Sequence, residues 1–312
     1  NVKNLKKFKN KVNIITAVNA FYNKESNFIQ NSSVISLTEI RTDQNISKIC
    51  TKNSLSLLAM EFVPRIARAQ KLDALSSQAS IAGYRAGLLA ATSLKKYLPL
   101  MMTAAGTIPP SSILVLGAGV AGLQAIATAK RLGAEVTGYD IRLAAGEQIE
   151  SLGAKFISDE VPEDSETSGG YAKEQSKDKQ SSQLEFLKEY ILKSDAVIST
   201  AAIPGRKAPI LIEKNTVEQM KAGSVIVDIS APSGGNCEST ILGESVNING
   251  TIVHGPKNLS SEMAYDASLV YSKNIYGLLE IIIKDSKIEM DLEDEIIDAM
   301  LVFQNGKKRI EG

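Results

Sequence analysis

The order of apolar and polar positions predicts strands that alternate with helices over most of the chain. Short apolar runs typical of buried strands lie at 113–116, 135–139, 195–200, 224–230 and 251–255. Stretches with helical character separate several of them, at 123–132, 184–193 and 211–221. Because strands joined by helices form parallel sheets, the pattern predicts an α/β fold with a mostly parallel sheet.

The flanking regions predict a second, discontinuous domain. Strands are expected at 33–37 and 54–61, and long helices at 73–97 and 264–285. The small residues of the 73–97 helix would allow close packing between domains or subunits. We expect the 264–285 helix to return to the first domain. The predicted architecture is therefore two Rossmann-like α/β domains with mostly parallel sheets, one formed by 1–75 plus 264–312 and one by 76–263.

One long polar segment interrupts the second domain. Between 158 and 183 the apolar residues are Val161, Tyr171 and Ala172, apart from a proline. A loop of this length in a compact domain is usually a functional lid or disordered. We expect a mobile loop at 158–183, and an unstructured insertion is the alternative.

The strand at 113–116 leads into a glycine fingerprint, GAGVAG, followed by a helix. Gly117 permits a tight turn, Gly119 lets the backbone approach a pyrophosphate, and Gly122 lets the helix pack close to the strand. The helix N-terminus offers N–H groups and partial positive charge to phosphate. The sequence therefore predicts dinucleotide binding, with Gly117, Ala118, Gly119, Val120 and Gly122 at the pyrophosphate. A glycine-rich turn in another α/β protein is the alternative.

An acid completes the fingerprint. Asp140 lies 18 residues after Gly122, at the end of the next strand, where a carboxylate can accept hydrogen bonds from the adenosine ribose. Ile141 and Arg142 follow and are expected near the adenosine. The carboxylate would repel a 2′-phosphate, which favours NAD over NADP, although a nearby arginine can accommodate that phosphate.

The remaining cofactor positions follow from strand order. Ala201 and Ala202 come after the 195–200 strand and should border the cofactor. Ligands of open α/β sheets bind at the carboxyl ends of the strands. We therefore expect NAD(H) in the cleft between the two domains.

Composition narrows the function classes. The 312 residues carry no net charge and show no basic stripe, which argues against a nucleic-acid partner. Cys50 and Cys237 have neither metal nor redox spacing, so we expect reduced thiols and no metal site. No apolar run approaches the roughly 18 residues of a membrane span. The lysine-rich start at Asn1 lacks signal-peptide features, and we expect residues to be missing before it.

A more specific motif lies upstream of the fingerprint. VPRIARAQKLDALSSQASIAGYRAG at 63–87, with the 101–142 region, resembles the NAD(H)-binding component (alpha subunit, domain I) of the proton-translocating NAD(P) transhydrogenases. Segments 199–209, 223–237 and 268–274 extend the resemblance to roughly 54–305. The first 50 residues match weakly, so the first domain looks N-terminally incomplete.

The resemblance implies an oxidoreductase that works within a complex. In this family the component binds NADH, a partner component binds NADP⁺, and hydride passes directly between the two nicotinamides. A membrane component conducts protons, and conformational change couples the two processes. The resemblance further implies a soluble homodimer peripheral to an energy-transducing membrane, which is the bacterial plasma membrane, the mitochondrial inner membrane or that of a related organelle.

The resemblance also assigns residues. The family's RxxRAQxxDxLSS loop faces the nicotinamide, which selects Arg65, Gln70, Asp73 and Ser76 in this chain. Arg65 and Asp73 would hold the carboxamide and ribose, and Gln70 would lie where the nicotinamides meet. A surface ion pair between Arg65 and Asp73, which would contribute little, is the alternative.

The polar segment resembles the family's mobile loop, which closes over NAD(H). Gly170 and Tyr171 lie in its Gly-Gly-Tyr-Ala element. The family's second tyrosine is replaced here by Lys179, so the closing contact would differ.

The histidine content bears on the chemistry. His254 is the chain's one histidine, and we interpret it as a loop or cap residue. Reduction of a carbonyl requires a proton donor, for which histidine is common, whereas hydride transfer between nicotinamides moves no proton at the reacting carbons. Positioning groups such as Arg, Gln, Asp and Ser are then sufficient.

Two alternative functions remain from the sequence. Alanine dehydrogenase shares the fold and fingerprint, but residues 1–62 contain no histidine and Pro232 stands where that enzyme has its catalytic acid. A non-catalytic NAD-binding module is the second alternative, and the intact Arg65, Gln70 and Asp73 argue against it.

Overall fold

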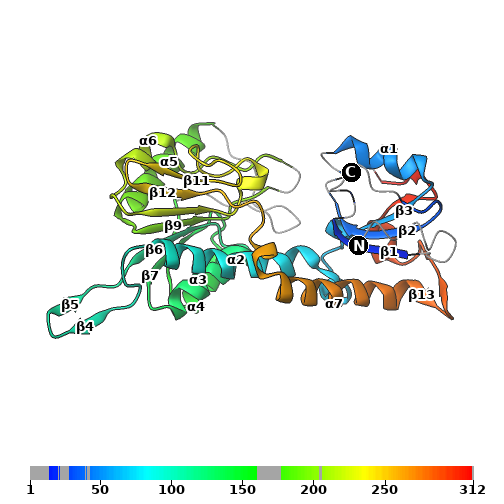
Figure 1. The fold of residues 1–312 in the computed structure, drawn as a ribbon, viewed down its shortest axis with the longest axis horizontal. Coiled ribbons are helices and arrows are strands. Elements are labelled where there is room, and N and C mark those ends of the chain that lie inside the picture. Colours follow the sequence, from blue (N-terminus) through cyan, green and yellow to red (C-terminus); the bar gives the residue numbers. More distant parts are fainter. Residues whose placement is uncertain are drawn as a thin grey trace. The chain divides into compact units, whose positions relative to one another are not determined.

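The computed structural model describes residues 14–19, 21, 28–38, 40, 43–159, 177–203 and 206–310. The chain divides into two compact units (Figure 1). Unit 1 consists of 1–78 and 265–312, and unit 2 of 79–264.

Unit 2 contains a seven-stranded sheet in the order β11-β12-β10-β9-β6-β7-β8. Its strands are β6 (Ser112–Leu116), β7 (Glu135–Tyr139), β8 (Lys155–Ile157), β9 (Ala196–Ser199), β10 (Val225–Asp228), β11 (Ser245–Ile248) and β12 (Thr251–His254). All neighbours pair in parallel except β11, which is antiparallel to β12. The first strand, β6, lies between β7 and β9, which is the doubly wound order of dinucleotide-binding domains.

Helices cover both faces of this sheet. They are α2 (Ala74–Ser93), α3 (Val120–Arg131), α4 (Ala145–Ser151), α5 (Lys177–Lys193) and α6 (Lys214–Gln219). Ile113 and Val115 of β6 pack in one core with α2, α3 and α4, whereas Leu114 packs on the opposite face with α5 and α6. Because both faces are buried, the strands are nearly continuous apolar runs, which is why the sequence pattern predicted them.

The predicted mobile loop was too long at its C-terminal end. Helix α5 begins at Lys177 rather than at 184, so Lys179 and Gln183 are helical. The polar side chains concealed this helix because its first turns carry few apolar residues. Residues 160–176, with Gly170 and Tyr171, lie outside the described residues.

The small residues of α2 have a role inside unit 2. A Cβ on Gly83 would overlap the carbonyl oxygen of Ala121 in α3, and one on Gly87 would lie 3.0 Å from the side chain of Thr128. These glycines let α2 pack directly on the backbone of α3. Gly83 and Gly87 therefore serve helix packing within one unit, and packing between subunits through other small residues of α2 stays a prediction.

Unit 1 contains a mixed five-stranded sheet in the order β1-β2-β3-β15-β16. Its strands are β1 (Ile14–Asn19), β2 (Ser33–Leu37), β3 (Ser56–Ala59), β15 (Leu301–Gln304) and β16 (Lys307–Lys308). The first three are parallel, but β15 and β16 run antiparallel to their neighbours, so this sheet is less parallel than predicted. The chain enters β15 directly from α8 (Glu295–Met300), and an antiparallel strand needs no crossover connection.

Helices also pack on both faces of this sheet. Leu58 of β3 faces a core with the 3₁₀ segment η3 (Ala67–Leu72), α7 (Ala264–Ile282) and α8, whereas Leu57 faces a core with α1 (Gln44–Lys52). The hydroxyl of Tyr271 in α7 donates to Ala17 O at 2.7 Å and accepts from Leu37 N at 3.0 Å. Burial raises the pKa of Tyr271 to about 12, so this hydroxyl keeps its proton and fastens α7 to β1 and β2.

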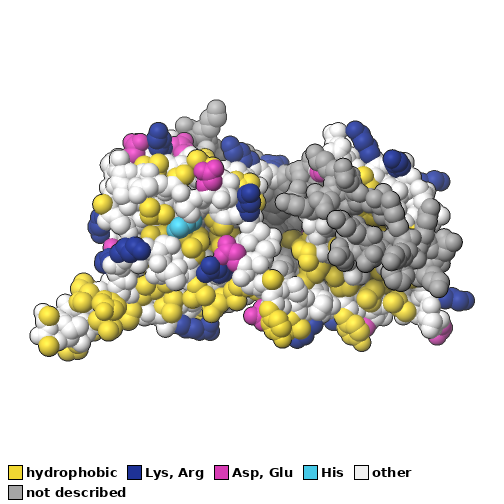
Figure 2. Space-filling view, viewed as in Figure 1, with side chains coloured by type: hydrophobic (Ala, Val, Ile, Leu, Met, Phe, Trp, Pro, Cys, Tyr) yellow, Lys and Arg dark blue, Asp and Glu magenta, His cyan; other side chains and the backbone are white. Residues whose placement is uncertain are grey.

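Two hairpins and three short 3₁₀ segments complete the described fold. The segments are η2 (Met60–Phe62), η4 (Ala231–Ser233) and η5 (Ser260–Met263), and the smaller hairpin joins β13 (Ile283–Lys284) to β14 (Lys287–Ile288). The hairpin of β4 (Met101–Thr103) and β5 (Gly106–Ile108) projects from unit 2 and carries hydrophobic side chains (Figures 1 and 2). Among the described residues, no helix has both the length and the apolar character required to cross a bilayer.

The single histidine joins three elements of unit 2. His254 ends β12, and its Nε2 lies 2.9 Å from Ser93 Oγ of α2 while its Nδ1 lies 2.7 Å from Ser245 Oγ of β11. Desolvation lowers the pKa of His254. The neutral ring can donate through one nitrogen and accept through the other, so it is a structural bridge rather than a loop residue.

The α2–α3 packing predicts the effect of enlarging Gly83. A Gly83→Ala substitution should destabilise the protein by about 1–3 kcal/mol, because the new methyl group meets backbone that cannot rotate away. The matched change Gly87→Ala would bring its methyl group to 3.0 Å from the side chain of Thr128, a much milder overlap, and should cost clearly less. Urea unfolding of both variants checks this, and equal stabilities would contradict the packing.

The histidine bridge predicts a pH dependence of stability. Because the folded pKa lies below the ordinary 6.5, the unfolded chain binds the proton first as the pH falls. The stabilisation is therefore complete above about pH 6.5 and declines as the pH falls through that value. Wild type should lose more unfolding free energy than His254→Gln between about pH 7.5 and about pH 5.5. Equal losses would show that the bridge does not titrate with folding.

Candidate functional site

The glycine fingerprint forms the turn between β6 and α3. Gly117 has φ +96°, a conformation that L side chains rarely adopt, and its amide donates to Tyr139 O at 2.8 Å. A Cβ on Gly117 would lie 2.8 Å from Thr200 Oγ1, and one on Gly122 would overlap Gly117 O. The first and third glycines are thus required by close packing of strand, turn and helix, as predicted.

The middle glycine differs from the other two. An added Cβ on Gly119 would meet no atom of the described chain within 4 Å. Gly119 is also the N-cap residue of α3, and the helix has neither a capping side-chain hydrogen bond nor an acid in its first turn among the described residues. The N–H groups and partial positive charge of this helix end therefore remain available to an anion, and the exposed Val120 follows directly. The geometry fits a pyrophosphate approaching the backbone at Gly119.

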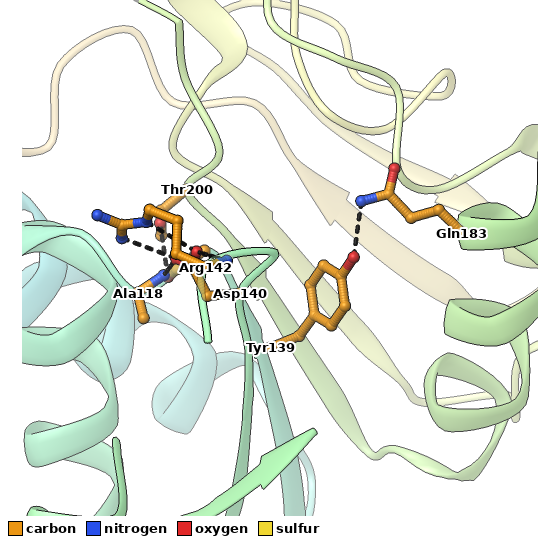
Figure 3. Close-up of polar contacts among 7 residues, drawn as sticks. Ala118, Tyr139, Asp140, Arg142, Gln183 and Thr200 are labelled. Carbon is orange, nitrogen blue, oxygen red and sulfur yellow. Dashed lines mark hydrogen bonds and ion pairs between the residues drawn. The ribbon is translucent and has the colours of Figure 1, made fainter. Parts of the chain in front are cut away.

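Asp140 is more tightly engaged than the sequence indicated (Figure 3). Its Oδ2 accepts from Ala118 N at 2.7 Å and from Arg142 Nη2 at 2.9 Å. Its Oδ1 accepts from the backbone N and from Nε of Arg142, each at 2.9 Å. Asp140 is only 6% exposed. Its bond to Ala118 N ties the end of β7 to the glycine turn. The amide of Ala118, predicted at the pyrophosphate, is therefore directed to Asp140.

Tyr139 points to the other side of β7 (Figure 3). Its hydroxyl donates to Asp159 Oδ1 at 2.7 Å and accepts from Gln183 Nε2 at 2.7 Å. Burial, followed by the bond to Asp159, raises the pKa of Tyr139 well above its ordinary value. The protonated hydroxyl thus ties the end of β8 to α5. Ile141, beyond Asp140, is half-buried against the core on this face.

The ends of β9 and β10 form one hydrogen-bonded network. Ser230 Oγ and Asn236 Nδ2 donate to Ala201 O at 2.9 and 2.8 Å. Asn236 also donates to Pro209 O at 2.7 Å. These bonds fix the backbone at Ala201, and the neighbouring Ala202 is exposed. The expected cofactor-bordering position is therefore held rigidly at the carboxyl edge of the sheet.

A buried aspartate that sequence reasoning did not single out organises this network. Asp228 ends β10 and is fully buried. Its Oδ2 accepts from Asn236 N, Cys237 N and Thr240 Oγ1 at 2.8, 3.1 and 2.7 Å. Its Oδ1 accepts from Ser199 Oγ and Ser230 N, both at 3.1 Å. The signal in the sequence was an acid at the end of an apolar strand. An acid buried at such a position needs several hydrogen-bond donors.

The predicted nicotinamide residues lie in unit 1. Arg65 and Gln70 are exposed, and Gln70 lies in η3. Asp73 precedes α2, and its carboxylate accepts from Ser76 N at 2.8 Å and Ser76 Oγ at 2.5 Å. The structure thus brings Asp73 and Ser76 together as a cap on the first turn of α2. This cap fixes the point at which the motif segment enters the helix.

Two further contacts hold this segment. Arg68 binds Asp294, at the start of α8, through two bonds of 2.8 and 2.7 Å. Asn274 of α7 donates to Lys71 O at 2.8 Å and accepts from Ser77 Oγ at 2.8 Å. Both residues lie in motifs that the sequence analysis quoted, but their positioning role needed the tertiary structure.

Other reactive groups are engaged in the fold. Burial raises the pKa of the Cys50 thiol to about 12 and that of the Cys237 thiol to about 11. Both cysteines are free and buried, so they remain protonated thiols. Pro232 lies in η4, in the loop after β10. A proline side chain there cannot transfer a proton.

The family comparison agrees with this geometry. Residues 2–82 match the model "Alanine dehydrogenase/PNT, N-terminal domain", and residues 86–311 match "Alanine dehydrogenase/PNT, C-terminal domain". The chain is 48% identical over 278 residues to an NAD(P) transhydrogenase alpha-subunit protein of Rickettsia prowazekii, covering 89% of this chain and 72% of that protein.

Solved structures support the same grouping. A transhydrogenase from Sinorhizobium meliloti superposes with a TM-score of 0.84 at 40% identity, covering 95% of this chain and 81% of that one. An L-alanine dehydrogenase gives a TM-score of 0.75 at 21% identity, over 96% of this chain and 78% of that one, a likeness of fold alone. The chain belongs to the alanine dehydrogenase/PNT family, and within it to the group of the NAD(P) transhydrogenase alpha subunits.

Proposed function

We propose that this chain is the NAD(H)-binding component of a proton-translocating NAD(P) transhydrogenase. The observation that carries the proposal is the glycine turn. Packing leaves no room for a side chain at Gly117 and Gly122, whereas Gly119 has open space beside the uncapped start of α3. The same chain retains the Arg65, Gln70, Asp73 and Ser76 motif on a segment held by Arg68 and Asn274. Similarity to transhydrogenase alpha subunits supports this choice.

NAD(H) is the proposed cofactor of this component. Gly119 and Val120 would hold the pyrophosphate through backbone N–H groups at the start of α3. Asp140 would accept from the adenosine ribose, with Ile141 and Arg142 nearby, and Ala201 and Ala202 would border the cofactor. A carboxylate at the ribose favours NAD(H), and NADP(H) is assigned to the partner component.

The proposed mechanism is positioning. When bound, NADH supplies the hydride, and no proton moves at the reacting carbons. Arg65, Asp73 and Ser76 would orient the carboxamide and ribose of the nicotinamide half, while Gln70 would lie where the second nicotinamide arrives. Exclusion of water and fixed orientation then account for rate acceleration, as in other reactions that depend on proximity.

The proposal implies partners and a location. The chain would act as a homodimer with an NADP(H)-binding component and a proton-conducting membrane component. It would lie peripheral to the membrane that carries them, either a bacterial plasma membrane, a mitochondrial inner membrane or that of a related organelle. Conformational change would couple hydride transfer to proton movement.

Alanine dehydrogenase activity is the second candidate because of the shared family. Pro232 in the loop after β10 opposes it, since this position offers no acid for proton transfer. His254 opposes it too, because the ring bridges Ser93 and Ser245 within the fold. A non-catalytic NAD-binding module is the third candidate.

The decisive experiment is a hydride-transfer assay. The purified chain should reduce an NADP⁺ analogue from NADH only when the NADP(H)-binding component of a related transhydrogenase is added. Pyruvate with ammonia is the control substrate pair. Turnover of that pair would replace the proposal by alanine dehydrogenase, and NADH binding without any turnover would favour the non-catalytic module.

The proposed placement of Gln70 where the nicotinamides meet predicts that its substitution changes the hydride-transfer rate more than the NADH affinity. Gln70→Asn should slow hydride transfer by about tenfold or more, because the shortened side chain shifts the meeting of the two rings. NADH affinity should stay within about twofold, since a contact made mainly at the transfer point adds little to ground-state binding. Lys71→Gln, a neighbour paired with Glu280 on the surface, is the matched control. Equal losses of affinity and rate in Gln70→Asn would assign Gln70 to simple binding.

A further inference from the structure

We propose that the Arg142 side chain occupies the ribose-binding side of Asp140 in the ligand-free protein, and that the vicinal diol of the adenosine ribose displaces it. Arg142 is then a specificity-determining residue that acts as an internal competitor. The inference rests on the proposed binding of NAD(H) to unit 2. The observation that supports it is the set of hydrogen bonds that the Asp140 carboxylate accepts.

The carboxylate of Asp140 has no spare capacity. An ionised carboxylate offers about four acceptor sites on its two oxygens. All are engaged, by Ala118 N, Arg142 N, Arg142 Nε and Arg142 Nη2, at 2.7–2.9 Å. A ribose can therefore bind Asp140 only if two existing donors leave.

The backbone donors cannot leave without unfolding the turn. Ala118 N lies in the glycine turn, which is fixed by the contact of Gly122 with Gly117 O. Arg142 N lies two residues along the same chain from Asp140. The guanidinium, by contrast, is carried on a side chain with several rotatable bonds, which can change rotamer while the backbone stays in place. The two guanidinium bonds are therefore the ones that a ligand would replace.

Only NAD(H) replaces the two guanidinium hydrogen bonds by an equal number of ribose hydrogen bonds. A guanidinium fork gives two parallel donors to a carboxylate, and a ribose with free 2′- and 3′-hydroxyls gives two donors as well. A 2′-phosphorylated ribose keeps one hydroxyl and brings negative charge to the carboxylate. With Arg142 left on Asp140, part of that repulsion is neutralised. The arginine therefore lowers the affinity for NADH and reduces the preference for NADH over NADPH.

Removal of the guanidinium tests both effects. Arg142→Met should bind NADH about fivefold more tightly than wild type, because no partly buried ion pair has to be broken. Its ratio of NADH to NADPH affinity should rise by about tenfold or more, because the carboxylate charge is no longer compensated. Fluorescence or calorimetric titration of both nucleotides gives these constants. Arg131→Met, at the other end of α3, is the matched control and should change neither.

Each other outcome decides against the inference. Weaker NADH binding by Arg142→Met would make Arg142 a direct ligand contact, and unchanged binding would mean that the pair persists in the complex. Thermal unfolding distinguishes either result from misfolding, and Arg142→Lys, which keeps the charge without the fork, should fall between wild type and Arg142→Met. A wild-type protein that binds no NADH would instead overturn the proposed function. A crystal structure with NADH in which Arg142 still binds both oxygens of Asp140 would also refute the exchange.

Discussion

The close approach of α3 to the end of β6 is the constraint on which the candidate site depends. Gly122 leaves no room for a Cβ beside Gly117 O, and Gly117 itself has a positive φ. The helix can therefore begin directly above the strand end, with its N–H groups directed outward at Gly119. Gly83 has a similar role, because the absence of a side chain there lets α2 pack on the backbone of α3 and fix the position of α3. The packing behind this edge therefore leaves the N–H groups at the start of α3 accessible, which is the basis of the proposed pyrophosphate site.

Much of unit 2 could be predicted from the sequence because its strands are buried on both faces. Apolar runs marked β6, β7, β9, β10 and β12, and the glycine spacing marked the turn. The start of α5 was missed because polar residues form its first turns. The interior strand β15 has four residues and follows α8 without a break, and the edge strand β16 has two residues, so neither stood out as a separate strand. Local pattern is informative for apolar runs bounded by turns, and it fails where a helix begins with polar residues or where a short strand continues directly from a helix.

The sequence could name candidate site residues but not their hydrogen-bond partners. The sequence identified Asp140, Asp73 and Ser76, yet it could not show that Asp140 holds Ala118 N and Arg142, or that Asp73 caps α2 through Ser76. Asp228 and Asn274 act through partners far along the chain, so no local spacing marks them. Motif resemblance names residue types, whereas their hydrogen-bond partners are set by tertiary structure.

The buried polar groups in the described part of the chain support a reaction that depends on orientation. Asp228 is saturated by five donors, His254 bridges two hydroxyls, and Tyr139 is held between a carboxylate and an amide. Groups engaged in this way stabilise loops and strand ends, and they are poorly placed to exchange protons with a substrate. Hydride transfer between nicotinamides needs rings held at a fixed approach and no proton relay at the reacting carbons. A scaffold whose buried acids, histidine and tyrosine hold strands, loops and helices in place is suited to that task.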